Sequence, residues 1–338
     1  MRGAPAHYPQ VTHSTLLLSS HSLDGAKNGD LYWAVAHIRR SAIVSVLTAF
    51  AAFSASAVLA QPNLRSMYVS VLNEQGAPVP DLGPSDFIVR EDNVAREVLR
   101  VSPATDPMQV AVLVDNSAAA RNDIADIRRG LHDFVTLMTA QSDATGRNEM
   151  AITTLADRPT IVTDYTTNAA ELHKGVDRIF SQPGSGTLLL EGIIEICKGM
   201  KAREPKRPVI VAITTEGVEF SDRFHDLVLE PLKSSGAAFH ALVVGPMSRG
   251  TSDAQRERGI VLDQGTLLTG GRRDNVLTSM SLPAKLKEVA TELTHQYRVT
   301  YAHPQSLIPP ERITVSASRP GMTARGVVIK ERAEGPRP

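Results

Sequence analysis

The fold of this chain is decided by residues 110–119, which read VAVLVDNSAA. Five consecutive apolar residues are typical of a strand that is buried on both faces of a sheet. The strand runs into Asp115, Asn116 and Ser117, and apolar residues then recur at helical spacing over residues 124–138. A polar loop between a buried strand and a helix is where open α/β sheets bind their ligands.

Working outward, strand-like and helix-like segments alternate through residues 107–295, whereas the polar, glycine-rich segment 246–270 gives no clear pattern. This alternation predicts a doubly wound, mainly parallel α/β sheet with helices on both faces. The other predicted strands cover residues 150–155, 160–162, 208–214 and 237–244, and the predicted helices cover 124–138, 169–180, 188–200, 224–233 and 286–293.

Short β-rich runs separated by turn residues lie on both sides of the α/β segment, and such runs predict a small antiparallel sheet. The C-terminal runs have no helical partners. We therefore expect the strands within residues 61–106 and 296–332 to combine into one β-sandwich-like module, with the α/β domain at 107–295. The predicted strands cover residues 68–72, 87–90, 94–101, 297–301, 313–316 and 326–329.

Residues 41–60 read SAIVSVLTAFAAFSASAVLA and follow a positive flank that ends at Arg40. This apolar stretch, with small residues at Val58 and Ala60, predicts a secretory signal peptide. An uncleaved membrane anchor is the alternative, because the stretch is nearly long enough to span a bilayer. Residues 1–40 are expected to be a disordered or non-native extension. The expected location is secreted or periplasmic, with membrane contact only through a retained leader.

The bulk composition excludes several classes of function. Lys+Arg and Asp+Glu both number 36 and aromatic residues make up 4% of the chain, so nucleic acid is not an expected partner. The single cysteine, Cys197, allows no intramolecular disulfide and is expected to be a buried, inert thiol. No Walker A or Gly-x-Ser-x-Gly motif occurs, and residues 184–189 match a dinucleotide fingerprint only in part. We therefore predict no catalytic residue and no organic cofactor.

The ten histidines are scattered, with His132 and His173 in predicted helices and His240 in a predicted strand. We expect core or surface roles for them, because His-x-x-x-His and Cys-x-x-Cys spacings are both absent and a zinc site has no support. The pairs Arg128-Arg129 and Arg272-Arg273 are expected to be solvated charges.

Three loops at the ends of predicted elements carry short oxygen-bearing side chains: residues 115–117, 184–187 and 214–217. In a doubly wound sheet all three would open at the same edge. Side-chain oxygens suit a hard divalent cation, and Mg²⁺ keeps several waters in its octahedral shell.

In their order and spacing, these loops resemble the von Willebrand factor type A domain. That family has a doubly wound α/β fold with a metal-ion-dependent adhesion site at the top of the sheet. Asp115 and Ser117 match its first acid and first serine, and Thr187 matches its threonine. Glu216 stands where the family has an aspartate, and Ala119 where it has a second serine.

The resemblance extends beyond the α/β domain and covers most of residues 66–330. Residues 79–92 and 296–301 are similar to the flanking strands of secreted bacterial proteins that carry such domains.

The resemblance implies that Asp115, Ser117, Thr187 and Glu216 hold Mg²⁺ or Mn²⁺, with an open position for a carboxylate of a partner. Ala119 removes a ligand and Glu216 is longer by one methylene, so the site is degenerate and metal affinity is expected to fall. The alternative is a relic site in which Asp115 and Ser117 cap the following helix.

The function expected from this resemblance is that of an exported, non-enzymatic, adhesion-like module that binds a protein at the top of the sheet. Its dependence on divalent metal is expected to be weak or lost. The alternatives are a metal-independent scaffold of the cell envelope and a hydrolase, although no nucleophile–base pair can be found in the sequence.

Overall fold

The computed structural model describes residues 63–330 apart from 141, 144–145, 247–251 and 305–307. The predicted leader and the extension before it lie outside the described residues. In the part that is described, no helix is both long enough and apolar enough to cross a bilayer.

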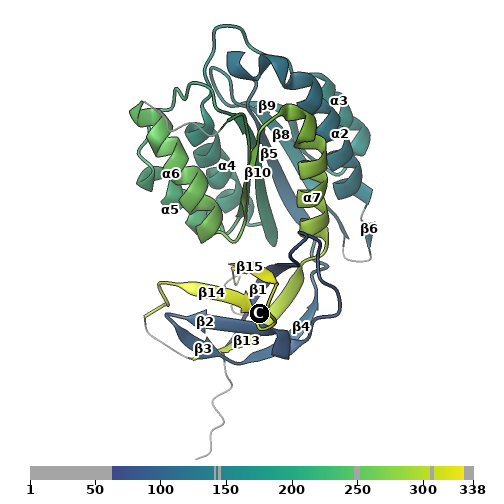
Figure 1. The fold of residues 1–338 in the computed structure, drawn as a ribbon, viewed down its shortest axis with the longest axis vertical. Helices are drawn as coiled ribbons and strands as arrows, with labels where there is room; N and C mark the ends of the chain where they lie inside the picture. Colours follow the sequence, from purple (N-terminus) through teal and green to yellow (C-terminus); the bar gives the residue numbers. More distant parts are fainter. Residues whose placement is uncertain (1–62, 141, 144–145, 247–251, 305–307, 331–338) are drawn as a thin grey trace, which may run out of the picture. The chain divides into compact units, whose positions relative to one another are not determined.

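A six-stranded sheet forms the centre of the α/β domain, with the order β12-β11-β10-β5-β8-β9 (Figure 1). Neighbouring strands are parallel, except that the edge strand β9 is antiparallel to β8. The predicted doubly wound, mainly parallel sheet is confirmed. The strands are β5 (Met108–Val114), β8 (Glu149–Thr154), β9 (Thr160–Thr166), β10 (Arg207–Thr215), β11 (Ala238–Val244) and β12 (Arg273–Val276).

Helices cover both faces of this sheet, and successive residues of β5 show how the faces divide. Val110, Val112 and Val114 pack against one group of helices, whereas Ala111 and Leu113 pack against the other. This alternation is the period of two that a strand imposes. The first group is α2 (Ile124–Ala140), α3 (Ala169–Asp177) and α7 (Leu282–Thr294), and the second is α4 (Leu189–Arg203), α5 (Asp226–Ser235) and α6 (Asp253–Leu268).

Cys197 lies in α4 within the second group, where it is buried as expected. Burial raises the pKa of its thiol to about 12, so the reactive thiolate is disfavoured.

Helix α6 and strand β12 were not expected from the sequence. The apolar stripe of α6 is narrow, because Val261 and Leu262 are its only buried large apolar residues. Gly265 in its interior allows close packing, since a Cβ there would lie 2.9 Å from Leu232 Cδ2. Glycine weakens the helical signal in the sequence while it permits this contact.

The expectation that Arg272 and Arg273 are solvated is wrong. Arg272 pairs with Asp274, with Glu288 at 2.9 Å and with Glu292 at 3.4 Å. Arg273 pairs with Asp263 at 2.8 Å. Both side chains are mostly buried at the β12 edge of the sheet, where carboxylates from α6 and α7 offset their charge.

Strands from both ends of the described chain combine into two small antiparallel sheets, with the orders β15-β1-β13-β4 and β14-β2-β3. The expected β-sandwich-like module is therefore observed, although the run predicted at residues 94–101 is two separate strands. The strands are β1 (Asn63–Leu72), β2 (Phe87–Glu91), β3 (Val94–Arg96), β4 (Val98–Pro103), β13 (Tyr297–His303), β14 (Ile313–Ala317) and β15 (Thr323–Val328). Short elements complete the fold: the 3-10 turns η1 (Pro84–Asp86), η2 (Ala118–Asn122) and η3 (Ser279–Ser281), and the hairpin of β6 (Ser142–Asp143) and β7 (Gly146–Arg147).

A buried carboxylate links the two sheets of this module. Glu91 at the end of β2 accepts hydrogen bonds from Arg96 Nε at 2.9 Å and from the Tyr301 hydroxyl at 3.1 Å. His303 Nδ1 lies 2.9 Å from both of its oxygens. Such a buried charge is tolerated because it is paired and hydrogen-bonded.

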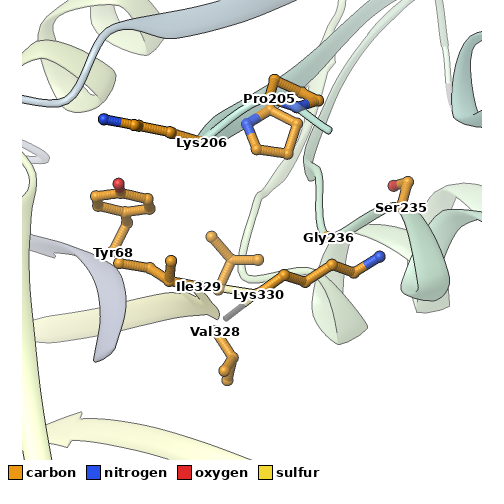
Figure 2. A pocket seen from close by; sticks show the side chains of 10 residues that line it. Tyr68, Pro205, Lys206, Ser235, Gly236, Val328, Ile329 and Lys330 are labelled. Carbon is orange, nitrogen blue, oxygen red and sulfur yellow. The ribbon is translucent and has the colours of Figure 1, made fainter. Parts of the chain in front are cut away.

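The module is joined to the α/β domain through Arg207, the first residue of β10, and beside this junction Val328 and Lys330 line a pocket together with Lys206 (Figure 2). Its guanidinium donates to the carbonyl oxygens of Ala104 and Asp106, which precede β5, and to Gln296 Oε1 at 2.7 Å. Burial lowers the pKa of Arg207 to about 10. One guanidinium therefore connects the start of β10 with both chain segments that link the module to the domain.

Gly270, after α6, makes a second contact with the module and yields a test of it. Gly270 has φ +71°, and a Cβ there would overlap the carbonyl of Gly326 in β15. We expect Gly270→Ala to lower the free energy of unfolding by about 2–4 kcal/mol, from left-handed backbone strain and overpacking. Gly199→Ala is the control, because a Cβ there meets open space in α4. In this control the free energy of unfolding should rise by up to about 1 kcal/mol, because alanine favours the helix more than glycine does. If both variants changed the free energy of unfolding in urea by the same amount, the contact between Gly270 and Gly326 would be contradicted.

Candidate functional site at the loop edge of the sheet

The predicted loops lie where the direction of winding reverses. From β5 the chain proceeds to β8 on one side, and from β10 it proceeds to β11 on the other, yet β5 and β10 are neighbours. This point, outside the carboxyl ends of the two strands, is the usual ligand crevice of an open α/β sheet. Asp115 directly follows β5, and Thr215 ends β10.

Asp115 is fully buried and ties these two strand ends together. Its Oδ1 accepts the backbone N–H of Ser117 at 2.9 Å. Its Oδ2 accepts both the backbone N–H and the hydroxyl of Thr215, at 3.0 and 2.7 Å. Hydrogen bonds to a carboxylate are among the stronger ones in proteins, so the first loop is held firmly against the end of β10.

Ser117 and Thr187 are fully buried, and their hydroxyl oxygens have no hydrogen-bond partner among the described residues. Ser117 is the N-cap residue of η2, but its side chain makes no capping bond. The alternative expectation, in which Ser117 caps the helix that follows, is therefore not met. A buried polar atom without a partner is uncommon and calls for an explanation such as a bound ion or ligand.

Backbone hydrogen bonds join the loop at residues 184–187 to the other two. The N–H of Thr187 donates to Val218 at 2.9 Å, and the N–H of Phe220 donates back to Thr187 at 2.8 Å. The N–H of Ala118 donates to Ser185 at 3.3 Å. The structure thus brings together the loops that carry Asp115, Ser117 and Thr187, as the sequence predicts.

Glu216, the fourth predicted ligand, is engaged by arginines. Its Oε2 accepts from Arg258 at 3.3 Å, and its Oε1 lies 3.9 Å from Arg273. A cation at this site would have to compete with two guanidinium groups for this carboxylate. The role of Glu216 as a ligand stays a prediction.

Ala119 is exposed, and it faces Gly217 from across the site. A Cβ on Gly217 would lie 2.5 Å from Ala119 Cβ and 3.8 Å from Ser117 Oγ. The two loops approach this closely only because residue 217 has no side chain.

Glu219 is a buried acid at this edge that sequence reasoning missed. Its Oε1 accepts the N–H groups of Leu189, the first residue of α4, and of Ser221, both at 3.1 Å, while its Oε2 has no partner within the described part of the chain. Burial raises its pKa to about 7, although Ser221 and Arg258 favour the ionised form. A single glutamate in a loop carries no sequence pattern that would have revealed this position.

Exposed apolar side chains surround the loops. Phe180 is 62% exposed, Val218 56% and Phe220 55%, and all three belong to loop segments hydrogen-bonded to the site. Arg128 lies over the ring of Phe180, 4.2 Å from its centroid, and donates to Ile179. The expectation that Arg128 is simply a solvated charge is therefore wrong.

The oxygens that are present fit a hard divalent cation in part. Asp115 supplies a carboxylate, and Ser117 and Thr187 supply two hydroxyls that no other described residue engages; these are ligand types that Mg²⁺ and Mn²⁺ accept. Across the described residues no group of three or more His, Cys, Asp or Glu side chains could hold a metal. A cation at this edge would therefore depend on the hydroxyls.

The strand order and the linked loops together define a von Willebrand A-like α/β domain. No family model matches the chain, and no curated protein sequence matches it. The structure is similar to a von Willebrand factor type A protein from Catenulispora acidiphila, with 9% identity, a TM-score of 0.45 and coverage of 79% of this chain and 74% of that one.

Two further solved structures are similar. One is the vWF domain of the type V pili tip protein Mfa5 from Porphyromonas gingivalis, with 12% identity, a TM-score of 0.42 and coverage of 56% and 96%. The other is proximal thread matrix protein 1 from the mussel byssus with a zinc-occupied MIDAS motif, with 14% identity, a TM-score of 0.44 and coverage of 60% and 49%. These values say nothing about the ligand of this chain.

Glu219 gives the site a measurable pH signature. Its folded pKa of about 7 lies above the ordinary 4.5, so the folded state binds the proton more tightly. Its contribution should therefore lower the stability of the wild type as pH rises from 4.5 to 7, by up to about 3 kcal/mol. When unfolding by urea is measured without metal, Glu219→Gln should not show this fall in the free energy of unfolding between pH 4.5 and 7. Glu230→Gln removes an exposed carboxylate of α5 and controls for net charge. Parallel pH profiles for wild type and Glu219→Gln would contradict the assignment.

Proposed function

We propose that this chain is an exported protein-binding module that docks a partner at the loop edge of its sheet, helped by a weakly held divalent cation. The observation that carries the proposal is the pair of buried hydroxyls of Ser117 and Thr187 beside the switch point, for which the described residues supply no partner. Their desolvation is costly unless something binds them. Export is the part of the proposal that rests on the predicted leader alone.

The residues divide the work at this edge. Ser117 and Thr187 would hold the cation with Asp115, and the bound ion would supply positive charge to attract a carboxylate of the partner. Asp115 also fixes the two strand ends on which the site is built. Ala119 offers no oxygen and Glu216 is shared with arginines, so the affinity for metal should be low.

The apolar rim supports a protein as the partner. Phe180, Val218 and Phe220 are exposed around a polar centre, and grouped exposed apolar side chains commonly mark protein interaction sites. Aromatic residues in particular are enriched where proteins meet.

Two alternatives remain distinguishable. A hydrolase would need a base within hydrogen-bond reach of its nucleophile, and the hydroxyl of Ser117 has no partner among the described residues. A metal-independent envelope scaffold would leave the loop edge without a ligand.

Metal binding is tested by the thermal melting midpoint in Mg²⁺ or Mn²⁺, which should rise with metal concentration because the ion binds only the native state. Ser117→Ala should abolish this rise. Without metal, its free energy of unfolding should be unchanged or higher by up to about 1 kcal/mol, because an unpaired buried hydroxyl is removed. Ala119→Ser should enlarge the rise. Asp115→Ala should also abolish the rise, but it breaks the bonds to Thr215 and is less informative. No response to millimolar metal in either wild type or Ala119→Ser would refute the metal-dependent form.

Partner binding is tested by affinity capture from envelope extract, with and without EDTA. Phe220→Ser should lose a partner that wild type retains, because an apolar contact is removed from the rim. Leu267→Ser is the matched control, since Leu267 is 77% exposed in the last turn of α6. The chain after that turn packs at Gly271 against Phe239, at the amino end of β11, and so lies at the opposite end of the sheet from the loops. The scaffold alternative predicts identical recovery for all three proteins.

A further inference from the structure

Two histidines from different helices meet away from the loop-edge site. His132 on α2 and His173 on α3 place their Nδ1 atoms 2.8 Å apart, with nearly parallel rings 5.0 Å between centroids. The residues are 41 positions apart in the chain, so no local spacing motif reveals them.

Asp177 orients one of these rings. Its Oδ1 lies 3.0 Å from Nε2 of His132. When Nε2–H donates to this carboxylate, the neutral ring of His132 has its lone pair on Nδ1, facing His173. A histidine whose second nitrogen donates to a carboxylate is the arrangement that proteins use to orient metal ligands.

We propose that His132 and His173 chelate a copper(II)-like divalent ion through their Nδ1 atoms, with Asp177 as the positioning residue of His132. Nitrogens 2.8 Å apart, each about 2.0 Å from one ion, subtend about 90° at the metal. That angle is the cis angle of the tetragonal geometry that Cu²⁺ and Ni²⁺ prefer. Tetrahedral Zn²⁺ would require the nitrogens to separate to about 3.3 Å.

Access and protonation both suit such an ion. His132 is 35% exposed and Asp177 is 67% exposed, so the ion can enter and water can fill its remaining positions. Burial, reinforced by His132, lowers the pKa of His173, so the neutral form of that ring is favoured. With His132 protonated at Nε2, the Nδ1–H tautomer of His173 donates to His132 Nδ1 in the metal-free pair. When the ion binds, His173 gives this proton to solvent and takes one up at Nε2, so the ring stays neutral and its Nδ1 lone pair is free to coordinate.

The test is Cu²⁺ titration of the full chain at pH 7 by calorimetry, with EPR to identify the nitrogen ligands. Wild type should bind one more ion than the double variant His132→Asn/His173→Asn, and its spectrum should show two imidazole nitrogens. Asp177→Asn should weaken this ion by about tenfold, at the low end for an orienting carboxylate because Asp177 is exposed. His295→Asn is the control, since His295 is exposed directly after α7 and contacts no other histidine in the described structure.

Two results would overturn the proposal. One is equal stoichiometry in wild type and the double variant, and the other is a wild-type spectrum without two equatorial imidazoles. The spectrum is recorded on unmodified protein, so it decides the matter even where a variant folds poorly. If His295→Asn lost as much bound Cu²⁺ as the double variant, the binding would be adventitious binding to surface histidines only.

Discussion

The buried carboxylate of Asp115 is the interaction on which the rest of this molecule depends. It accepts three hydrogen bonds from two loops that are a hundred residues apart in sequence, and so it closes the ends of the two central strands. The loops that carry Ser117 and Thr187 are arranged around that closure by backbone hydrogen bonds. Without the carboxylate, buried donors of Thr215 would lose their acceptor at the centre of the site.

A second charge works at the opposite end of the same strand pair. Arg207 is the first residue of β10, and its guanidinium donates hydrogen bonds to carbonyl oxygens of the segments that lead into and out of the β-module. The pair β5–β10 is therefore fixed by an anion at its carboxyl end and a cation at its amino end. Both groups are buried, and both are tolerated because each oxygen of Asp115 and each terminal nitrogen of Arg207 has a backbone partner.

The strand at residues 110–114 and the loop after it could be predicted because a fully apolar run and a short polar loop have few other structural solutions. Helix α6 could not, since its buried face holds Arg258 and Gly265 beside two aliphatic residues. Partners could not be predicted either. Glu216 pairs with arginines, Glu219 accepts a hydrogen bond from the start of α4, and His132 contacts His173. All three contacts depend on tertiary packing that no local spacing in the sequence encodes.

The β-module also determines how the chain would carry mechanical load. In the C-terminal half of β1, Ser70 is hydrogen-bonded to Gln296 and Tyr68 to Asp106, and both partners lie next to Arg207. Asn63 is the first residue of the same strand. A pull between a partner at the loop edge and the chain before Asn63 would thus run along β1. Because β1 is paired on both sides, with β13 and β15, its hydrogen bonds would be loaded in shear and share the force, instead of opening one after another.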